Sequence, residues 1–408
     1  MARVLLANEL GHGDAPLRRA LPLALALRER GHEPVLALND LPRAEPALAE
    51  LGLPVLQCPV WRSRVGGLPP VHTYTDILLR YGFAQATGLC GVARAWRDLV
   101  RLLQPAVLAL DHAPVALFAT RGLGVPRLRF GDGFGCPPLA VPMPAMSWWD
   151  ATPEPFDLIG ERNALHVANQ AAADLGLPVA ASVAELLRPE GEALCVLPEL
   201  DAYAGRPDGD YCGALVAADE GPETPWPEGD GACCFVALRA QHPLLPALVE
   251  ALRHGGQRAV LQLADGTPEQ AAALSRDGIV VARAPVPLAQ VRAQASHAVG
   301  DGHTAITQAL LLAGKPLLLL PTLLEQGMLA RRVAALGAGR MVDGAADAAA
   351  LGHALQALVD DPSWAAAAQA FAERHREQSD ARTLAAVIER IERLLAAPPP
   401  AIPSETRP

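Results

Sequence analysis

The sequence predicts an α/β protein of two doubly wound domains, each a parallel sheet covered by helices. Its 408 residues are more than one hydrophobic core usually serves, so two domains of ordinary size are expected. Hydrophobic residues make up 51% of the chain and charged residues 19%, which indicates a folded chain and not a disordered one. Short apolar runs alternate with helical patterns in both halves, as is typical of parallel sheets.

Buried strands are predicted in the first half of the chain over residues 4–7, 34–38, 107–110 and 127–130. Leu17–Arg30 carries apolar residues at helical spacing, and Gly31 follows at the expected stop, so a helix is predicted there. Asp111 ends the third strand, and Asp132 lies in the glycine turn after the fourth. Ligands in such sheets bind beyond the carboxyl ends of strands, so both carboxylates are candidates for a site.

Two stretches interrupt this alternation. Pro137–Pro155 is rich in Pro, Met and Trp and is predicted to be a long loop. Ala217–Gly231 is packed with Pro, Gly, Asp and Glu and is predicted to be the interdomain linker. The predicted organisation is an N-terminal domain over 1–216, a linker over 217–231, a C-terminal domain over 232–378, a C-terminal helix over 379–397 and a flexible tail over 398–408.

Strands of the second domain are predicted over residues 234–238, 258–263, 279–281, 297–300 and 317–320. Helices are predicted between them over 244–254, 268–274 and 304–313, and after them over 345–358, 363–378 and 380–395. The second half therefore repeats the alternation of the first.

Composition excludes several classes of partner. The formal net charge of -10 argues against nucleic acid, whose binders need a basic surface. The first residues lack the features of a cleaved leader and are expected to form a strand. The richest apolar run, Ala309–Leu324, is broken by Lys315, Pro316 and Pro321, so no transmembrane segment is expected. The seven cysteines show no CxxC spacing and are expected to be reduced, which predicts a cytoplasmic protein.

A glycine turn in the second half has the form of an anion site. The strand predicted at His297–Gly300 runs into the turn Asp301–Thr304, and a helix follows. Free backbone N–H groups and the helix dipole at such a turn point at a ligand, which predicts a phosphate group near it. Glu325 and Gln326 begin the next predicted helix and are expected to hydrogen-bond a polyhydroxylated ligand. An alternative stays open, because the same turn occurs in every doubly wound domain.

Three segments carry a resemblance to a known family. The run "AGKPLLLLPTLLEQGMLARRVAALGAG" resembles the donor-binding segment of the family-one glycosyltransferases. "ANELGHGDAPLRRALPLALALRERGHEP" resembles the opening of that family, and "LALDHAPVALFATRGLGVPRLRFGDGF" resembles its mid-domain strand. The resemblance implies the GT-B fold, in which two Rossmann-like domains with parallel sheets face each other across a cleft.

The resemblance also implies an activity. It implies transfer of a sugar from a nucleotide diphosphate sugar, bound by the second domain, to an acceptor hydroxyl or other nucleophile bound by the first. No metal or cofactor is implied, UDP and dTDP are the favoured nucleotides, and the reaction is expected to be inverting. In the family a turn histidine, oriented by an aspartate, deprotonates the acceptor, while helix amides stabilise the departing diphosphate.

The chain departs from the family at two positions. Alignment places the family's turn histidine on Pro16, which cannot exchange a proton, and its phosphate-side histidine on Asp301. A carboxylate about 4 Å from a diphosphate charge costs about 1 kcal/mol in water and roughly 4 kcal/mol at an effective dielectric near 20. An Asp301 that faces the donor is therefore expected to repel it, unless the side chain turns away or binds a cation.

Local substitutes define the predicted site. The predicted catalytic residues are His12, Asp14 and Asp111. The predicted donor-binding residues are Asp301, Gly302, His303, Thr304, Glu325 and Gln326. The predicted acceptor-binding residues are Tyr74, Asp76, His112 and Asp132. Trp148 and Trp149 are further candidates for the acceptor side, although packing in a core or interface is the favoured interpretation of both.

Other functions stay open beside the glycosyltransferase. One alternative is a catalytically silent GT-B homologue that binds a ligand or a partner transferase, which Pro16 and Asp301 favour. Another is a GT-B epimerase that acts on the nucleotide sugar itself. The expected partners are a small-molecule donor and acceptor, and a homodimer is left open.

Overall fold

The computed structural model describes residues 1–11, 15–49, 51–68, 70–150, 154–203, 206, 208–216, 222–342 and 344–400. His12 and Asp14, two of the predicted catalytic residues, lie outside these described residues. The chain separates into two compact units. Unit 1 comprises residues 1–195, 203–213 and 381–408, and unit 2 comprises residues 196–202 and 214–380.

This division groups the chain differently from the predicted domains. Residues 196–202 and 214–216 belong to unit 2, although they lie inside the predicted N-terminal domain. The predicted linker is grouped with unit 2, and the C-terminal helix from Ala381 onward is grouped with unit 1. Ion pairs account for the last difference, because Arg390 of that helix pairs with Asp210 and Glu392 pairs with Arg30.

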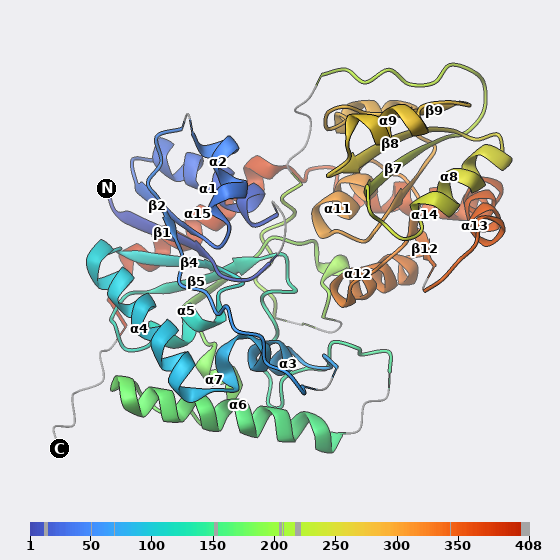
Figure 1. The fold of residues 1–408 in the computed structure, drawn as a ribbon. Helices are drawn as coiled ribbons and strands as arrows, with labels where there is room; N and C mark the ends of the chain where they lie inside the picture. Colours follow the sequence, from blue (N-terminus) through green and yellow to red (C-terminus); the bar gives the residue numbers. More distant parts are fainter. Residues whose placement is uncertain are drawn as a thin grey trace. The chain divides into compact units, whose positions relative to one another are not determined.

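Unit 1 contains a six-stranded parallel sheet in the order β3-β2-β1-β4-β5-β6. Its strands β1, β2, β4 and β5 are labelled in Figure 1. Its strands are β1 (Arg3–Asn8), β2 (Glu33–Leu38), β3 (Val55–Gln57), β4 (Val107–Asp111), β5 (Arg127–Gly131) and β6 (Gly191–Leu194). Its helices are α1 (Ala15–Glu29), α2 (Leu41–Leu48), α3 (Tyr74–Leu78), the π-helix η1 (Leu79–Phe83), α4 (Ala86–Leu103), α5 (Pro114–Ala119), α6 (Glu154–Leu175), α7 (Val183–Leu186) and α15 (Asp380–Ala396).

Unit 2 contains a second six-stranded parallel sheet in the order β12-β11-β10-β7-β8-β9. Its strands are β7 (Cys233–Arg239), β8 (Arg258–Ala264), β9 (Ile279–Val281), β10 (His297–Gly300), β11 (Leu317–Leu319) and β12 (Gly339–Met341). Its helices are the 3-10 helix η2 (Pro198–Leu200), α8 (Leu245–His254), α9 (Pro268–Leu274), α10 (Leu288–Gln294), α11 (Thr304–Leu312), α12 (Leu324–Ala335), α13 (Ala348–Asp360) and α14 (Pro362–Arg374).

The apolar runs predicted every strand of the two sheets except β3, β6 and β12. Every residue of β4 and β5 is buried, as expected for central strands covered on both faces. In unit 1 the largest buried side chains include Trp96, Phe83 and Phe118, and the last two rings meet edge to face with centroids 5.8 Å apart. In unit 2 the core lies between the sheet and the helices α8 and α13, which pack side by side (Figure 1).

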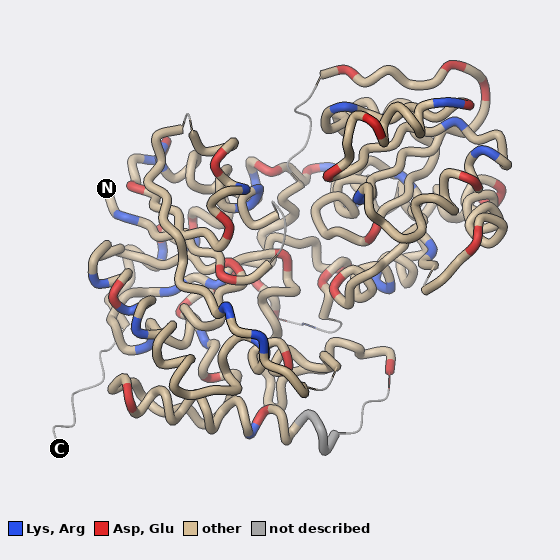
Figure 2. The backbone as a smooth tube through the Cα atoms, in the orientation of Figure 1, with Lys and Arg blue, Asp and Glu red and all other residues tan. Residues whose placement is uncertain are grey.

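Charged residues are interspersed over both units, as Figure 2 shows. None of the helices in the described part of the chain is both long enough and apolar enough to cross a membrane. All seven cysteines are free thiols, and all but Cys212 are buried.

Candidate functional site

The order of the strands locates one candidate crevice in each unit. In unit 1 the sheet extends from β1 toward β2 in one direction and from β4 toward β5 in the other. In unit 2 the same reversal occurs between β7 and β10. Ligands of open α/β sheets bind beyond the carboxyl ends of the two strands at such a reversal. The loops that follow β1, β4, β7 and β10 are therefore the places to look for function.

In unit 2 the turn after β10 leads into the N-terminus of α11. The first backbone hydrogen bond of the helix is donated by the N–H of Thr307 to the carbonyl of His303. The N–H groups of residues 304–306 come before it and have no backbone acceptor within the helix. No side chain of the described residues caps this end of α11. These three amides and the helix dipole have the form of an anion site, whereas the His303 amide is already bonded to Asp301.

Gly302 is fixed by a close approach to α12. Its φ is +90°, in the left-handed region that favours glycine. A Cβ at this position would lie 2.7 Å from the backbone oxygen of Gln326. The glycine therefore lets the turn pack directly on the first turn of α12.

Asp301 turns toward its own loop and toward α12. Its Oδ1 accepts a hydrogen bond from the backbone N–H of His303 at 2.9 Å, and its Oδ2 accepts one from Nε2 of Gln326 at 2.9 Å. The side chain is buried, with 8% of the residue exposed. Both carboxylate oxygens thus meet N–H donors of the protein, which offsets the cost of burying the charge.

Gln326 uses its amide within the protein. Its Oε1 accepts hydrogen bonds from the backbone N–H groups of Thr322 and Leu323 and from the hydroxyl of Thr322, at 2.8, 3.1 and 3.1 Å. Its Nε2 donates to Asp301, so the Gln326 side chain joins the loops after β10 and β11 to the start of α12. Glu325 lies beside it in the first turn of α12 and is half-buried.

Sequence reasoning missed His242, in the loop after β7. Its Nε2 lies 2.9 Å from the carbonyl oxygen of Leu320, and its Nδ1 accepts the backbone N–H of Leu244 at 3.2 Å. Nε2 therefore carries the proton and donates to that carbonyl. The buried imidazole ties the β7 loop to the end of β11. Its position after a strand at the reversal is the signal that could have identified it.

In unit 1, Arg19 of α1 joins two of the predicted site carboxylates. Its Nε and Nη2 donate to Oδ2 and Oδ1 of Asp111 at 2.8 and 3.2 Å, and its Nη1 donates to Oδ2 of Asp132 at 3.1 Å. Burial raises the pKa of Asp111 to about 6, although the Arg19 guanidinium opposes this shift. The sequence analysis did not identify Arg19, which lies 92 positions before Asp111.

Glu9 is a second buried carboxylate at the end of β1 that sequence reasoning missed. Its Oε1 accepts from Nε1 of Trp96 at 3.1 Å, and its Oε2 accepts from the backbone N–H groups of Val115 and Ala116 at 2.8 and 3.4 Å. It therefore caps the N-terminus of α5 from a distant part of the chain. Burial raises the pKa of Glu9 to about 8, and the three donors oppose the shift.

His112 follows Asp111 directly and lies among aromatic side chains. Its φ is 44°, an uncommon conformation for a residue with a side chain. Its ring centroid lies 5.8 Å from that of Tyr74 and 5.9 Å from that of Phe134. Its carbonyl accepts the backbone N–H of Leu10 at 3.0 Å, which joins the loop after β4 to the loop after β1. The structure thus brings His112, Tyr74 and the Asp111 neighbourhood together.

The other predicted acceptor residues have structural partners. Oδ2 of Asp76 accepts from the backbone N–H groups of His72 and Thr73 at 2.9 and 2.8 Å, and so closes the start of α3. Tyr74 is 2% exposed, and burial raises its pKa well above the ordinary value. The rings of Trp148 and Trp149 meet edge to face at 5.3 Å. Trp148 is 37% exposed, which leaves part of its ring on the surface.

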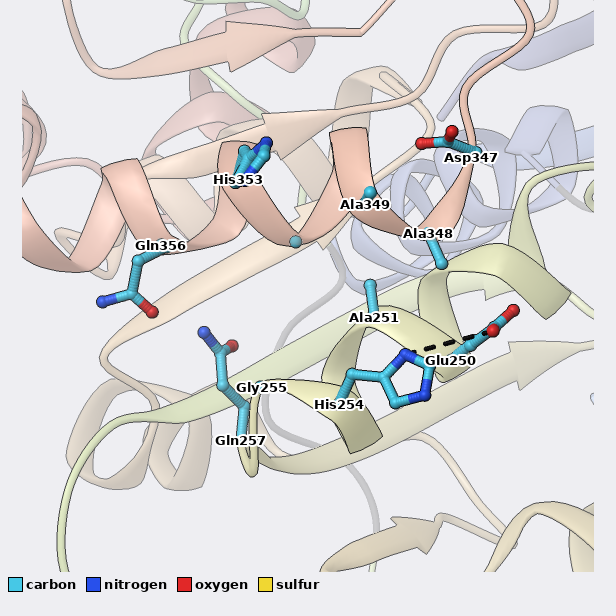
Figure 3. Close-up of a pocket in the computed structure, with 11 residues that line it drawn as sticks. Glu250, Ala251, His254, Gly255, Gln257, Asp347, Ala348, Ala349, His353 and Gln356 are labelled. Atoms are coloured by element: carbon cyan, nitrogen blue, oxygen red, sulfur yellow. Dashed lines mark ion pairs between the residues drawn. The ribbon is translucent and has the colours of Figure 1, made fainter.

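A pocket of about 640 Å³ lies between α8 and α13 and contains none of the predicted site residues (Figure 3). Gln257 and Gln356 extend toward one another from its two walls, and His254 pairs with Glu250 at 3.9 Å. Its floor is formed by small residues such as Ala251 and Ala348. Among the described residues, no group of three or more His, Cys, Asp or Glu side chains is arranged to hold a metal ion.

No protein-family model and no curated protein matches this chain. Solved structures do match over nearly its whole length. The calicheamicin glycosyltransferase CalG4 has 18% identity and a TM-score of 0.71, with 97% of this chain and 98% of that chain covered. The glycosyltransferase VinC in complex with DTDP has 18% identity and a TM-score of 0.67, with 97% and 99% covered.

A third similar structure is the spinosyn rhamnosyltransferase SpnG complexed with thymidine diphosphate. It has 19% identity and a TM-score of 0.64, with 95% of this chain and 100% of that chain covered. At such identities the similarity establishes the fold. With its two six-stranded parallel sheets and their flanking helices, the chain has the GT-B fold that the sequence predicts.

Proposed function

We propose that this GT-B protein is a glycosyltransferase that transfers a sugar from a nucleotide diphosphate sugar to an acceptor hydroxyl. The observation that carries the proposal is the Gly302 turn, which delivers the uncapped N-terminus of α11 to the strand reversal of unit 2. A diphosphate is the anion that the donor would present there. The similar structures named above are glycosyltransferases, and two of them hold a thymidine diphosphate.

In the proposed reaction the amides of α11 stabilise the negative charge that develops on the departing diphosphate. Such preorganised donors act on the charge of the transition state without a metal ion. The acceptor binds to unit 1, and its hydroxyl attacks the sugar with inversion at the anomeric carbon. Asp301 and Gln326 do not contact the donor in this proposal. They hold the turn and α12 in the shape that presents the amides.

The donor is best tested by calorimetry with UDP, dTDP and GDP at fixed salt. One of these should bind, and at about 100 times its Kd it should stabilise the native state by roughly 2.7 kcal/mol. The matching nucleoside without phosphates is the control, and it should bind much more weakly. If no nucleotide binds at millimolar concentration, the proposal is wrong.

A silent GT-B protein is the second candidate function, and the contact between Arg19 and Asp111 favours it. In the family that the sequence resembles, an aspartate at this position orients a histidine base, whereas here both Asp111 oxygens accept from Arg19. Assay with radiolabelled nucleotide sugars separates the two functions. A protein that binds the diphosphate but neither transfers nor hydrolyses any sugar is a binding protein.

A further inference from the structure

We infer that His112 is the general base that deprotonates the acceptor, an inference that rests on the proposed transferase function. Both carboxylate oxygens of Asp111 accept hydrogen bonds from Arg19. A carboxylate held in this way by a guanidinium is a poor partner for a histidine base in the β1 loop. Among the described residues, we therefore look for a proton acceptor elsewhere at the strand reversal of unit 1.

His112 has the position that a base requires. It is the first residue after β4, at the carboxyl end of one of the two strands where the sheet of unit 1 reverses direction. Its carbonyl is bonded to Leu10 of the loop after β1, so the residue is fixed between the two loops of the candidate crevice. The ring is half-buried, and an imidazole has an ordinary pKa of about 6.5, suited to a base near neutral pH.

The protein holds His112 in a conformation that its own chain disfavours. A φ of 44° is costly for a residue with a Cβ, and such conformations cluster at functional sites. Gly135 permits the close packing, since a Cβ there would lie 2.8 Å from the Cβ of His112. Phe134 meets the imidazole edge to face, with the ring planes at 89°, and Tyr74 packs on it at a tilt. These contacts fix where the imidazole lies.

Among the described residues, four titratable or charged groups near His112 bear on its role, each from a different element. They are Asp111 on β4, Arg19 on α1, Asp132 after β5, and Tyr74 on α3. Arg19 neutralises one of the two carboxylates, and Tyr74 is buried with a raised pKa, so it stays neutral near pH 7. Because Arg19 occupies both oxygens of Asp111, the imidazole is the group of this set that we assign as the base.

In the proposed step one proton and one sugar group change partners. A nitrogen of His112 takes the proton of the acceptor O–H as the acceptor oxygen forms a bond to the anomeric carbon. The bond between that carbon and the phosphate oxygen breaks, and its electron pair leaves with the nucleoside diphosphate. The imidazolium then releases its proton to solvent.

The test compares His112→Asn with His166→Asn. Asparagine accepts left-handed backbone conformations better than most residues, so the first variant removes the imidazole and keeps the turn. His166 is an exposed residue of α6 and controls for the substitution itself. Transfer rates are measured from pH 5 to pH 9, and the Kd of the nucleoside diphosphate is measured by calorimetry.

We expect H112N to lower kcat by about 100-fold or more and to remove the fall of kcat/KM at acidic pH, with the diphosphate Kd unchanged. H166N should match the wild type. Gly135→Ala is a second variant, which displaces the ring of His112 but keeps the imidazole. Its transfer rate should be lower than that of the wild type, and its kcat/KM should still decrease at acidic pH.

Two outcomes overturn the inference, and they are distinguishable. If the wild type transfers sugar and H112N retains its rate and pH profile, only the role of His112 is wrong. If the wild type transfers no sugar from any nucleotide donor, the transferase proposal fails as well.

Discussion

Nε2 of Gln326 lies 2.9 Å from Oδ2 of Asp301, and this hydrogen bond joins the loop after β10 to the first turn of α12. From sequence alone, the two side chains are expected to face a donor, one repelling its diphosphate and the other binding its sugar. In the structure their polar atoms are bonded to each other and to backbone N–H groups. The pair therefore holds the loop after β10 against the start of α12, and the consequences can be tested.

The first prediction concerns this pair. Asp301→Asn places an amide N–H donor against the amide of Gln326, and Gln326→Glu places a second carboxylate against Asp301. Each variant loses the hydrogen bond, so each should lower the free energy of unfolding by about 1–3 kcal/mol. In the double variant the new amide donates to the new carboxylate, and we expect a favourable coupling of about 0.5–3 kcal/mol. Urea unfolding of the four proteins measures it. Strictly additive effects would show that the bond contributes nothing.

The second prediction concerns Gly302, with Gly344 as its matched control. Both glycines have a positive φ, +90° at Gly302 and +70° at Gly344. A Cβ added at Gly302 would lie 2.7 Å from the backbone oxygen of Gln326, whereas a Cβ added at Gly344 would have no atom within 4 Å. Each change to Ala should cost about 1–2 kcal/mol of backbone strain. Gly302→Ala should cost about 1–3 kcal/mol more, because the turn or α12 must move.

The same pair of variants tests the anion site. Gly302→Ala should weaken nucleoside diphosphate binding, since the amides of α11 shift with the turn, and Gly344→Ala should leave the Kd as in the wild type. Calorimetry at one salt concentration provides the comparison. Equal affinities in the two variants would place the diphosphate away from this turn.

The third prediction is a pH dependence caused by Glu9. Its pKa is raised from 4.5 to about 8 in the folded protein, so the folded state binds more protons than the unfolded state between these values. Its contribution to stability is therefore fully present below pH 4.5 and is lost as the pH rises toward 8. Between pH 6.5 and 8 the loss amounts to about 2 kcal/mol.

Glu9→Gln should flatten this part of the stability profile, because the amide does not titrate. The comparison uses pH values above 6.5 because of His297, whose pKa is lowered by burial to about 4. Below pH 6.5 this histidine makes the free energy of unfolding rise with pH, which would mask the effect of Glu9. The measurement is the free energy of unfolding in urea at several pH values. Parallel profiles for the two proteins would rule out Glu9 as the cause.

The fourth prediction concerns the cation between two carboxylates. Arg19→Met leaves Asp111 and Asp132 without their shared guanidinium, and we expect a loss of about 3–5 kcal/mol, since an uncompensated buried charge remains. Arg101→Met on α4 is the control, because it breaks an exposed pair with Asp98 that is worth about 0.2–1 kcal/mol.

Adding Asp111→Asn to the Arg19→Met variant should restore part of the loss, because it removes one of the two unpaired charges. Chemical unfolding at pH 7 measures all three proteins. If the Arg19 and Arg101 variants lose equal stability, the ion cluster of unit 1 contributes no more than a surface pair.

Much of the fold could be predicted from local pattern. The strands β1, β2, β4 and β5 and the helix α1 lie where the apolar runs and their spacing predict them. Burial of one helix face, or of a whole strand, requires apolar residues at regular positions, and the sequence shows this pattern. The two long helices α4 and α6 were not predicted. The buried stripe of α4, which includes Trp96 and Val100, has helical spacing and was the available signal.

The residues of the candidate site could likewise be predicted only in part from the sequence. Sequence alone identified the turn at Gly302, the strand end at Asp111 and the neighbouring His112, since strand ends and glycine turns are local features. The partners of these residues were decided only by tertiary structure. Arg19 meets Asp111 across 92 positions, Glu9 meets Val115 across 106, and Gln326 meets Asp301 across 25. A hydrogen bond between distant residues leaves no periodic pattern in the sequence, because it depends on which loops the order of the strands brings together.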